Sequence, residues 1–309
     1  MAEISRREFL AKFATGVALS CTLPPGLRLL RGQVNSLTPE LVAVQGPSPR
    51  ENVRHALNLL GGIGAFVRRG DVVVVKPNMS WDRLPEQAAN TNPEVVAEIV
   101  RLCIEAGARK VKVFDRTCNE PRRCYQRSGI QAAAAKEGAE VSFVMEQRFR
   151  EVHIPEGELL KSWPMYRDVL EADVLINVPI LKHHSVSGLT MGLKNMMGVL
   201  GGDRGQLHHS FDKKISDVNT VLRPQLTVLD ATRVLVRNGP QGGNVRDVRV
   251  MDTVVAGVDR VAVDAYGAQV FGLQPEKMGF LVEAAQRGLG KIDLTKLRIQ
   301  KTTLREGSS

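Results

Sequence analysis

The stretch Asp71–Lys76, which reads DVVVVK, decides the fold. Four consecutive valines leave the segment without a polar face, and this is typical of a parallel strand that helices cover on both sides. Comparable apolar runs recur at Lys110–Asp115 (KVKVFD), Asp173–Pro179 (DVLINVP) and Gln225–Asp230 (QLTVLD). The chain is therefore predicted to contain a buried, mainly parallel sheet.

Helical patterns separate these strands. Apolar residues recur with helical spacing in Glu51–Val67, Pro93–Ala106, Ser128–Glu137 and Asp259–Phe271, and further short strands are expected at Leu41–Gln45, Glu140–Val144 and Thr253–Gly257. Alternating strands and helices predict an α/β fold, a mainly parallel sheet flanked by helices. The layering is Rossmann-like without a dinucleotide fingerprint, because neither GxGxxG nor GxxxxGK[ST] occurs. The irregular segment 146–163 is a candidate lid or insertion.

Charge and cysteine content narrow the functional classes. The net charge of the 309 residues is +9; the first 32 residues hold five basic and two acidic residues, so the remainder carries +6. That excess favours an anionic small ligand, whereas the scattered basic residues and the low aromatic content exclude a nucleic-acid role. No Cys-x-x-Cys motif occurs, so the chain has no iron–sulfur cluster motif of its own. A disulfide between Cys118 and Cys124 is left open.

The N-terminus carries an export pattern. Residues 5–12 read SRREFLAK, and the pair Arg6–Arg7 is followed by an apolar stretch that ends at Pro24. This layout predicts a twin-arginine signal over residues 1–32 and delivery to the periplasm by the twin-arginine translocase. Contact with the membrane is predicted only through this segment. Its apolar stretch is shorter than the roughly 20 apolar residues that a membrane-spanning helix needs. The alternative is a soluble helix with a chance arginine pair, and the cleavage site and lipidation stay open.

After the signal, residues 33–304 are predicted to form a single α/β domain, and residues 305–309 a disordered tail. Polar residues follow several of its strands: Lys76 and Asn78, then Asp115, then Lys182 with His183 and His184, then Asp230. The carboxyl ends of parallel strands meet at one edge of a sheet, where ligands of α/β proteins bind. These residues are therefore predicted to form a ligand site. The alternative is that they are caps and turns.

The segment 179–210 is the densest in polar residues. It holds Lys182, Lys194, two His-His pairs and six glycines, so little of it is expected to form a conventional core. Lysines suit a phosphate or carboxylate, and histidines suit a metal or a proton transfer. In the alternative interpretation the histidines are surface residues and Met191–Val199 is an ordinary helix.

Several motifs together resemble the family known as domain of unknown function 362. They are VVVKPN (Val73–Asn78), TNPEVVAEIV (Thr91–Val100), EAGARKVKVFD (Glu105–Asp115), ADVLINVPILKHH (Ala172–His184), TMGLKNMMGVLGG (Thr190–Gly202), LTVLDA (Leu226–Ala231), NGPQGG (Asn238–Gly243) and VDRVAVDA (Val258–Ala265). The resemblance implies an α/β domain without an established activity. Many relatives carry a ferredoxin-like module, which this sequence lacks.

A second, weaker similarity involves the run Gly192–Gly198 with the later pair His208–His209. It looks like part of the nickel-dependent lactate racemase family, in which a lysine tethers a nickel pincer cofactor and a histidine ligates the metal. Only Lys194 and one of His208 or His209 match. The resemblance implies a metal-containing cofactor.

The sequence thus predicts an exported protein that binds an anionic small molecule or a metal-containing cofactor, with Lys/His acid–base or metal-assisted chemistry. The predicted catalytic residues are Lys182, His183 and Lys194. The predicted ligand contacts are Lys76, Asn78, Thr190, Asn195, Asp230 and Asp264, and the predicted metal ligands are His183, His208 and His209. The alternative is a non-catalytic ligand- or metal-binding or redox-accessory protein that serves a partner.

Overall fold

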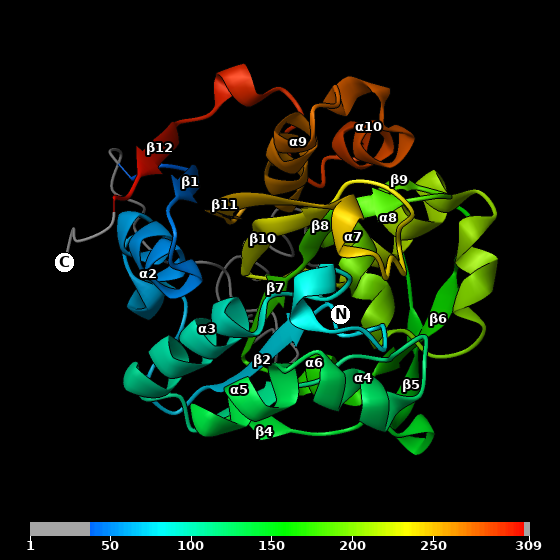
Figure 1. Cartoon of the computed structure of the whole chain (residues 1–309). Coiled ribbons are helices and arrows are strands. Elements are labelled where there is room, and N and C mark those ends of the chain that lie inside the picture. The colour runs from blue at the N-terminus through cyan, green and yellow to red at the C-terminus, as the bar shows by residue number, and fades with distance from the viewer. Residues whose placement is uncertain (1–37, 306–309) are drawn as a thin grey trace, which may run out of the picture. The chain divides into compact units, whose positions relative to one another are not determined.

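A ten-stranded sheet organises the computed structural model, which describes residues 38–305. The order of its main path is β12 (Ile299–Thr303), β1 (Leu41–Gln45), β11 (Val248–Gly257), β10 (Leu226–Leu235), β7 (Val174–Val178), β2 (Val72–Pro77), β3 (Lys110–Val113) and β4 (Glu140–Val141) (Figure 1). Off this path, β8 (Ile180–His184) pairs with β10 and with β9 (Gly188–Thr190).

The pairing confirms the predicted fold class. Strands β10, β7, β2, β3 and β4 pair with one another in parallel, and they include all four predicted buried strands. The antiparallel pairs of this sheet are those of β11 with β1 and β10, and that of β9 with β8. A mainly parallel sheet brings the strand ends to one edge, as the α/β prediction requires.

Helices cover both faces of the sheet. Their bounds are α2 (Pro49–Leu59), α3 (Pro93–Glu105), α4 (Pro121–Arg127), α5 (Ile130–Lys136), α6 (Arg167–Glu171), α7 (Gly192–Asn195), α8 (Phe211–Val221), α9 (Arg260–Phe271) and α10 (Gly279–Gln286). Helices α2, α3 and α5 lie on one side of the strands, and α8, α9 and α10 lie on the other (Figure 1).

The valines of β2 show why helices must cover both faces of the sheet. Val73 and Val75 pack among α2 and α3, whereas Val74 points to the opposite face and packs with Leu175 and Val218. All three valines are fully buried. Since side chains alternate along a strand, a segment with no polar position has to be enclosed on both sides.

Some predicted boundaries were wrong. The helix predicted over Glu51–Val67 ends at Leu59, because Gly61 and Gly62 take positive φ of 97° and 79° and break it. Segment 146–163 contributes to a separate two-stranded sheet of β5 (Phe149–His153) and β6 (Ser162–Tyr166).

The segment 179–210 was also misjudged, because much of it is core. Leu181, Leu189, Met191, Leu193 and Met196 are all completely buried. Instead of one ordinary helix, Met191–Val199 forms the single turn of α7 followed by a 3-10 turn, Met196–Val199. Its apolar side chains anchor the polar ones between them.

The N-terminal signal and the last four residues of the predicted tail lie outside the described residues. Within residues 38–305, no helix is both long and apolar enough to cross a bilayer.

Candidate functional site

A cavity of about 470 Å³ opens at the carboxyl edge of the sheet, and we call it the site cavity. It is formed by the ends of β2 and β3, by β8 and β9, by α7 and by the 3-10 turn Arg204–His208. The structure brings together in it the following predicted residues: Lys76, Asn78, Lys182, Thr190, Lys194, Asn195 and His208. Lys76 and Lys194, far apart in sequence, thus face one space.

Lys76 and Asp115 form a buried ion pair at the floor. Lys76 Nζ lies 2.8 Å from Asp115 Oδ1, and both side chains are almost completely buried. Asp115 Oδ2 accepts from the Met79 amide at 2.7 Å and from Ser80 Oγ at 3.0 Å. Burial lowers the pKa of Lys76, and the Asp115 carboxylate opposes that shift. Gly198 packs against the pair so closely that a Cβ there would lie 1.9 Å from Asp115 Oδ1.

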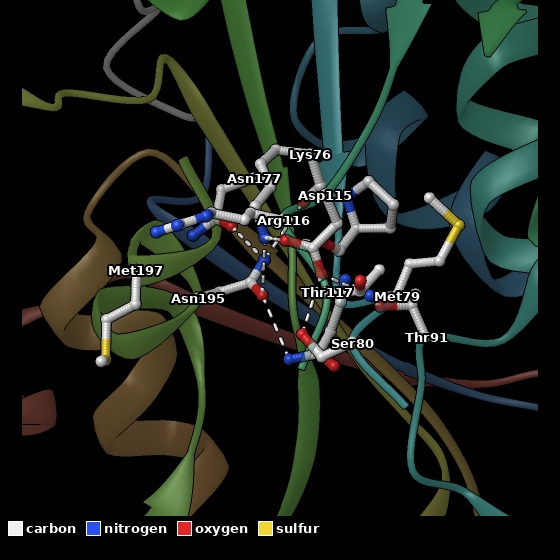
Figure 2. A network of polar contacts seen from close by, with 12 residues as sticks. Lys76, Met79, Ser80, Thr91, Asp115, Arg116, Thr117, Asn177, Asn195 and Met197 are labelled. Carbon is white, nitrogen blue, oxygen red and sulfur yellow. Dashed lines mark hydrogen bonds and ion pairs between the residues drawn. The ribbon is translucent and has the colours of Figure 1, made fainter. Parts of the chain in front are cut away.

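Asn195 joins this floor to α7. Its Oδ1 accepts from Lys76 Nζ at 3.1 Å (Figure 2). The same oxygen accepts from Asn78 Nδ2 at 3.3 Å. Its Nδ2 donates to the Lys76 carbonyl at 3.1 Å and to Asn177 Oδ1 at 2.8 Å. The amide therefore uses both its oxygen and its nitrogen to fix α7 against β2 and β7, which leaves the neighbouring Lys194 in a defined place.

Lys182 enters the cavity from β8 without a carboxylate partner. Its Nζ donates to the Ala89 carbonyl and to Asn78 Oδ1, and it lies 5.9 Å from the centre of the Trp81 ring. The side chain is 1% exposed. Burial lowers the pKa of Lys182 to about 7. Near neutral pH both the charged and the neutral form of this amine are therefore populated.

Lys194 is a second buried lysine of the cavity without a carboxylate partner among the described residues. Its Nζ lies 3.2 Å from His208 Nε2, 3.6 Å from Met197 Sδ and 4.5 Å from the centre of the Phe211 ring. Burial lowers its pKa to about 7 as well. Two lysines that titrate near neutrality in one cavity are a feature of functional sites.

His184, which shares the cavity wall, is fixed as a neutral ring. Its Nδ1 accepts from the amides of Val186 at 3.1 Å and Ser187 at 3.3 Å, so the ring proton is on Nε2. Burial, followed by the Lys194 charge, lowers the pKa of His184 to about 3. The sequence prediction names its neighbour His183 in place of His184.

His183, which was predicted to be a site residue, does not line the cavity. Side chains alternate along β8, so Lys182 and His184 face the cavity while His183 faces away. Its Nδ1 accepts from the Gly239 amide at 3.1 Å and so holds the loop after β10. The alternation along β8, a strand that is not predicted from the sequence, selects His184 instead.

Three further predicted residues lie outside the cavity. His209 follows the 3-10 turn and is exposed, so the member of its pair that faces the site is His208. Asp230 is a structural acceptor: it binds the Asn92 amide at 2.7 Å, next to the start of α3, and Thr232 Oγ1 at 2.7 Å. Asp264 accepts from the amides of Gly192 at 2.6 Å and Leu193 at 2.8 Å. It therefore orients the first turn of α7 without touching the cavity.

Sequence reasoning missed several cavity residues. Arg204 is largely enclosed, and its guanidinium donates to the carbonyls of Arg116 at 2.9 Å and Thr117 at 3.0 Å. Burial lowers its pKa. Cys118 and Trp81 also line the cavity, and they come from loops whose folding no periodic pattern predicts.

The donor atoms do not favour a metal ion held by the protein. Between residues 38 and 305, no three His, Cys, Asp or Glu side chains are grouped so that they could hold one. The proposed ligands are separated because His183 faces away and His209 is exposed. Cys118 and Cys124 are free thiols, and Cys124 is buried with its Sγ donating to the Ser80 carbonyl, so the open disulfide alternative is not realised.

Two solved structures are similar to this chain at low sequence identity. It is similar to the lactate racemase apoprotein from Thermoanaerobacterium thermosaccharolyticum, with 12% identity and a TM-score of 0.48 over 74% of this chain and 56% of that one. It is also similar to a protein from Thermotoga maritima, with 12% identity and a TM-score of 0.44 over 77% and 60% of the two chains. The chain spans little more than half the length of these proteins.

Relatives in sequence are more informative. The chain is 28% identical over 247 residues to a thylakoid-associated protein of Synechocystis sp., an alignment that covers 77% of this chain and 74% of that protein. Residues 73–269 match the model of the family described as Domain of unknown function (DUF362). Since that match includes every cavity residue discussed above and more than half of the chain, this protein belongs to the DUF362 family.

Proposed function

We propose that the site cavity binds an anionic small molecule through a carboxylate or phosphate group. The observation that carries the proposal is an excess of buried positive charge. Lys182, Lys194 and Arg204 all face the cavity, and none of them has a carboxylate partner among the described residues, whereas Lys76 is matched by Asp115. A bound anion would supply the missing charge and raise the pKa of both lysines again.

An unused hydroxyl group supports the same proposal. Thr190 is 3% exposed and lines the cavity, and its Oγ1 has no hydrogen-bond partner within the described part of the chain. A buried hydroxyl without a partner costs free energy, about 1–3 kcal/mol. A ligand oxygen would satisfy it and would be oriented by it.

The chemistry that this arrangement supports is proton transfer to and from the bound anion. Lys194 in its neutral form is a base, and His208 Nε2 lies within hydrogen-bond distance of it. A pKa of about 7 for Lys194 suits a group that must both accept and donate a proton near neutral pH. Buried groups with shifted pKa favour an enzyme over the alternative of a non-catalytic carrier. A metal-containing cofactor stays a prediction.

We also propose that the protein works in the periplasm after export by the twin-arginine translocase. This proposal rests on Arg6, Arg7 and the apolar stretch after them, which lie outside the described residues.

Calorimetric titration tests the proposed binding. The chain without residues 1–32 would be titrated at pH 6.5 with acetate, pyruvate, malonate, sulfate and inorganic phosphate, in parallel with Lys182→Met. Binding of at least one anion that weakens tenfold or more in the variant is expected. Equal binding by both proteins would contradict the proposed site. For the catalytic part, hydrogen–deuterium exchange at the ligand carbon beside the carboxylate, followed by proton NMR in D2O, should occur in the wild type only.

A further inference from the structure

A second hollow of about 760 Å³ adjoins the site cavity, and the two share His208 as a wall. We call it the apolar groove, after the lining side chains Val186, Phe211, Leu273, Met278 and Phe280. It lies between the β8–β9 turn on one side and the start of α8 and of α10 on the other.

A column of stacked rings runs from one hollow into the other. His184 stacks on His208 with 5.8 Å between ring centres, and His208 stacks on Phe211 at 6.0 Å. Phe211 then meets Phe280 edge to face at 5.8 Å. Because His184 lines the cavity and Phe280 lines the groove, one continuous wall serves both.

Lys194 lies beside the junction of the two hollows. Its Nζ contacts His208 Nε2 and lies over the ring of Phe211, which is a groove residue. An anion held by Lys194 therefore has its remaining atoms close to the groove. The groove is lined by charged groups of both signs, Asp212 and Glu283 with Lys213 and Lys277, so it has no excess of positive charge like that of the site cavity.

The rim of the groove leaves apolar surface in water. Val186 is 61% exposed and Leu273 is 42% exposed. Covering such surface is favourable by roughly 25 cal/mol per Å². From this continuity we propose that the ligand is an amphipathic anion, with its carboxylate or phosphate in the site cavity and an apolar chain or ring in the apolar groove. The inference rests on the proposed function and adds the class of ligand to it.

A homologous series of straight-chain carboxylates, from acetate to decanoate, provides the test. Dissociation constants would be measured by calorimetry at pH 6.5, below the concentration at which the longer chains form micelles. We expect affinity to rise about fourfold for each methylene that enters the groove, from the transfer free energy of one methylene. In the double variant Val186→Ser with Leu273→Ser, acetate should bind as before and the gain per methylene should diminish. The matched control is Val250→Ser, which changes a 63% exposed valine of β11 outside both hollows.

The outcomes separate the two proposals. If short anions bind but affinity does not grow with chain length, the amphipathic ligand is wrong and the anion site stands. If the gain with length persists unchanged in the double variant, the chain lies elsewhere and the groove assignment is overturned. If no member of the series binds and the anions named above do not bind either, the proposed function itself fails.

Discussion

Lys194 Nζ lies 3.2 Å from His208 Nε2, and on the far side of the ring His208 Nδ1 lies 3.2 Å from the Gly205 carbonyl oxygen. A carbonyl only accepts, so Nδ1 carries the proton and Nε2 is left as the acceptor for the lysine. Burial lowers the pKa of His208, which keeps the ring neutral. The pair is thus arranged so that Lys194 has a fixed direction whether it is protonated or not.

Replacement of Lys194 tests its part in binding. In Lys194→Met most of the apolar stem is kept and the charge over the Phe211 ring is lost, so folding should be nearly intact. Affinity for a bound anion should fall tenfold to about 150-fold, equivalent to roughly 1.5–3 kcal/mol for a charged hydrogen bond. Calorimetry measures this. Lys296→Met is the control, because that lysine is 75% exposed and pairs with Asp293 outside the site. An equal loss of affinity in both variants would show that the effect comes from the net charge of the protein and not from contact between Lys194 and the anion.

Binding should depend on pH with a definite sign. The pKa of Lys182 and of Lys194 is about 7 in the unliganded protein, so both lose their protons as the pH rises through neutrality. Affinity for sulfate, whose own charge is constant from pH 6 to 9, should therefore fall above pH 7, by up to about tenfold per unit for each lysine that must be protonated. A flat profile over that range would show that neither lysine changes charge there.

The same shifts have an opposite consequence for the stability of the unliganded protein. Between pH 7 and 10.5 the unfolded chain binds more protons at Lys182 than the folded chain does. Its contribution to the free energy of unfolding therefore rises with pH across that window. Below pH 7 the cost of burying the charged lysine is fully present.

The Lys76–Asp115 pair should be essential to folding rather than to binding alone. Asp115→Asn leaves Lys76 buried without its counter-charge, and we expect the free energy of unfolding to drop by about 3–5 kcal/mol in urea titrations. Adding Lys76→Met should recover part of that loss, because the buried charge is then gone. Glu105→Gln, at a half-exposed pair with Arg101, should cost less than about 1 kcal/mol and is the control. A loss no larger in Asp115→Asn than in the control would contradict the assignment.

How much the sequence predicts differs between fold and site. The sheet was predictable because Val73, Val74 and Val75 exclude a half-exposed strand. The convergence of Lys76 and Lys182 follows from parallel strands that end at one edge, whereas Lys194 reaches the cavity from helix α7. The two-residue period of β8 separates His184, which faces the cavity, from His183, which faces away. A strand is predicted from the sequence only as far as Pro179, so this period has no predicted strand to apply to at the two histidines.

The remaining site residues had no such signal. Asp230 and Asp264 have the side chains of a ligand site, and only their contacts with the Asn92 and Gly192 amides show that they are structural. Arg204 and Cys118 come from irregular loops, and tertiary packing alone brings them beside the lysines. Contacts of this kind depend on loop conformation, which no periodic pattern in the sequence predicts.

The export prediction is tested by changing both arginines of the signal. Arg6→Lys combined with Arg7→Lys should hold the protein in the cytoplasm, since the pair is the recognised feature of the twin-arginine signal. Fractionation of cells that produce wild type and variant measures this. Undiminished arrival of the double variant in the periplasm would contradict the twin-arginine prediction and favour the alternative, a soluble helix with a chance arginine pair.

The central claim is that the site cavity is an anion site, and bromide in a crystal measures it most directly. Crystals of the chain without residues 1–32 would be soaked in sodium bromide at pH 6.5. Diffraction data would be collected at the bromine absorption edge, and an anomalous difference map would be calculated from them. The account predicts a strong peak inside the cavity, in contact with Nζ of Lys182 or Lys194, and its disappearance in Lys182→Met with Lys194→Met. Peaks confined to surface lysines and arginines, with no bromide in the cavity, would contradict it.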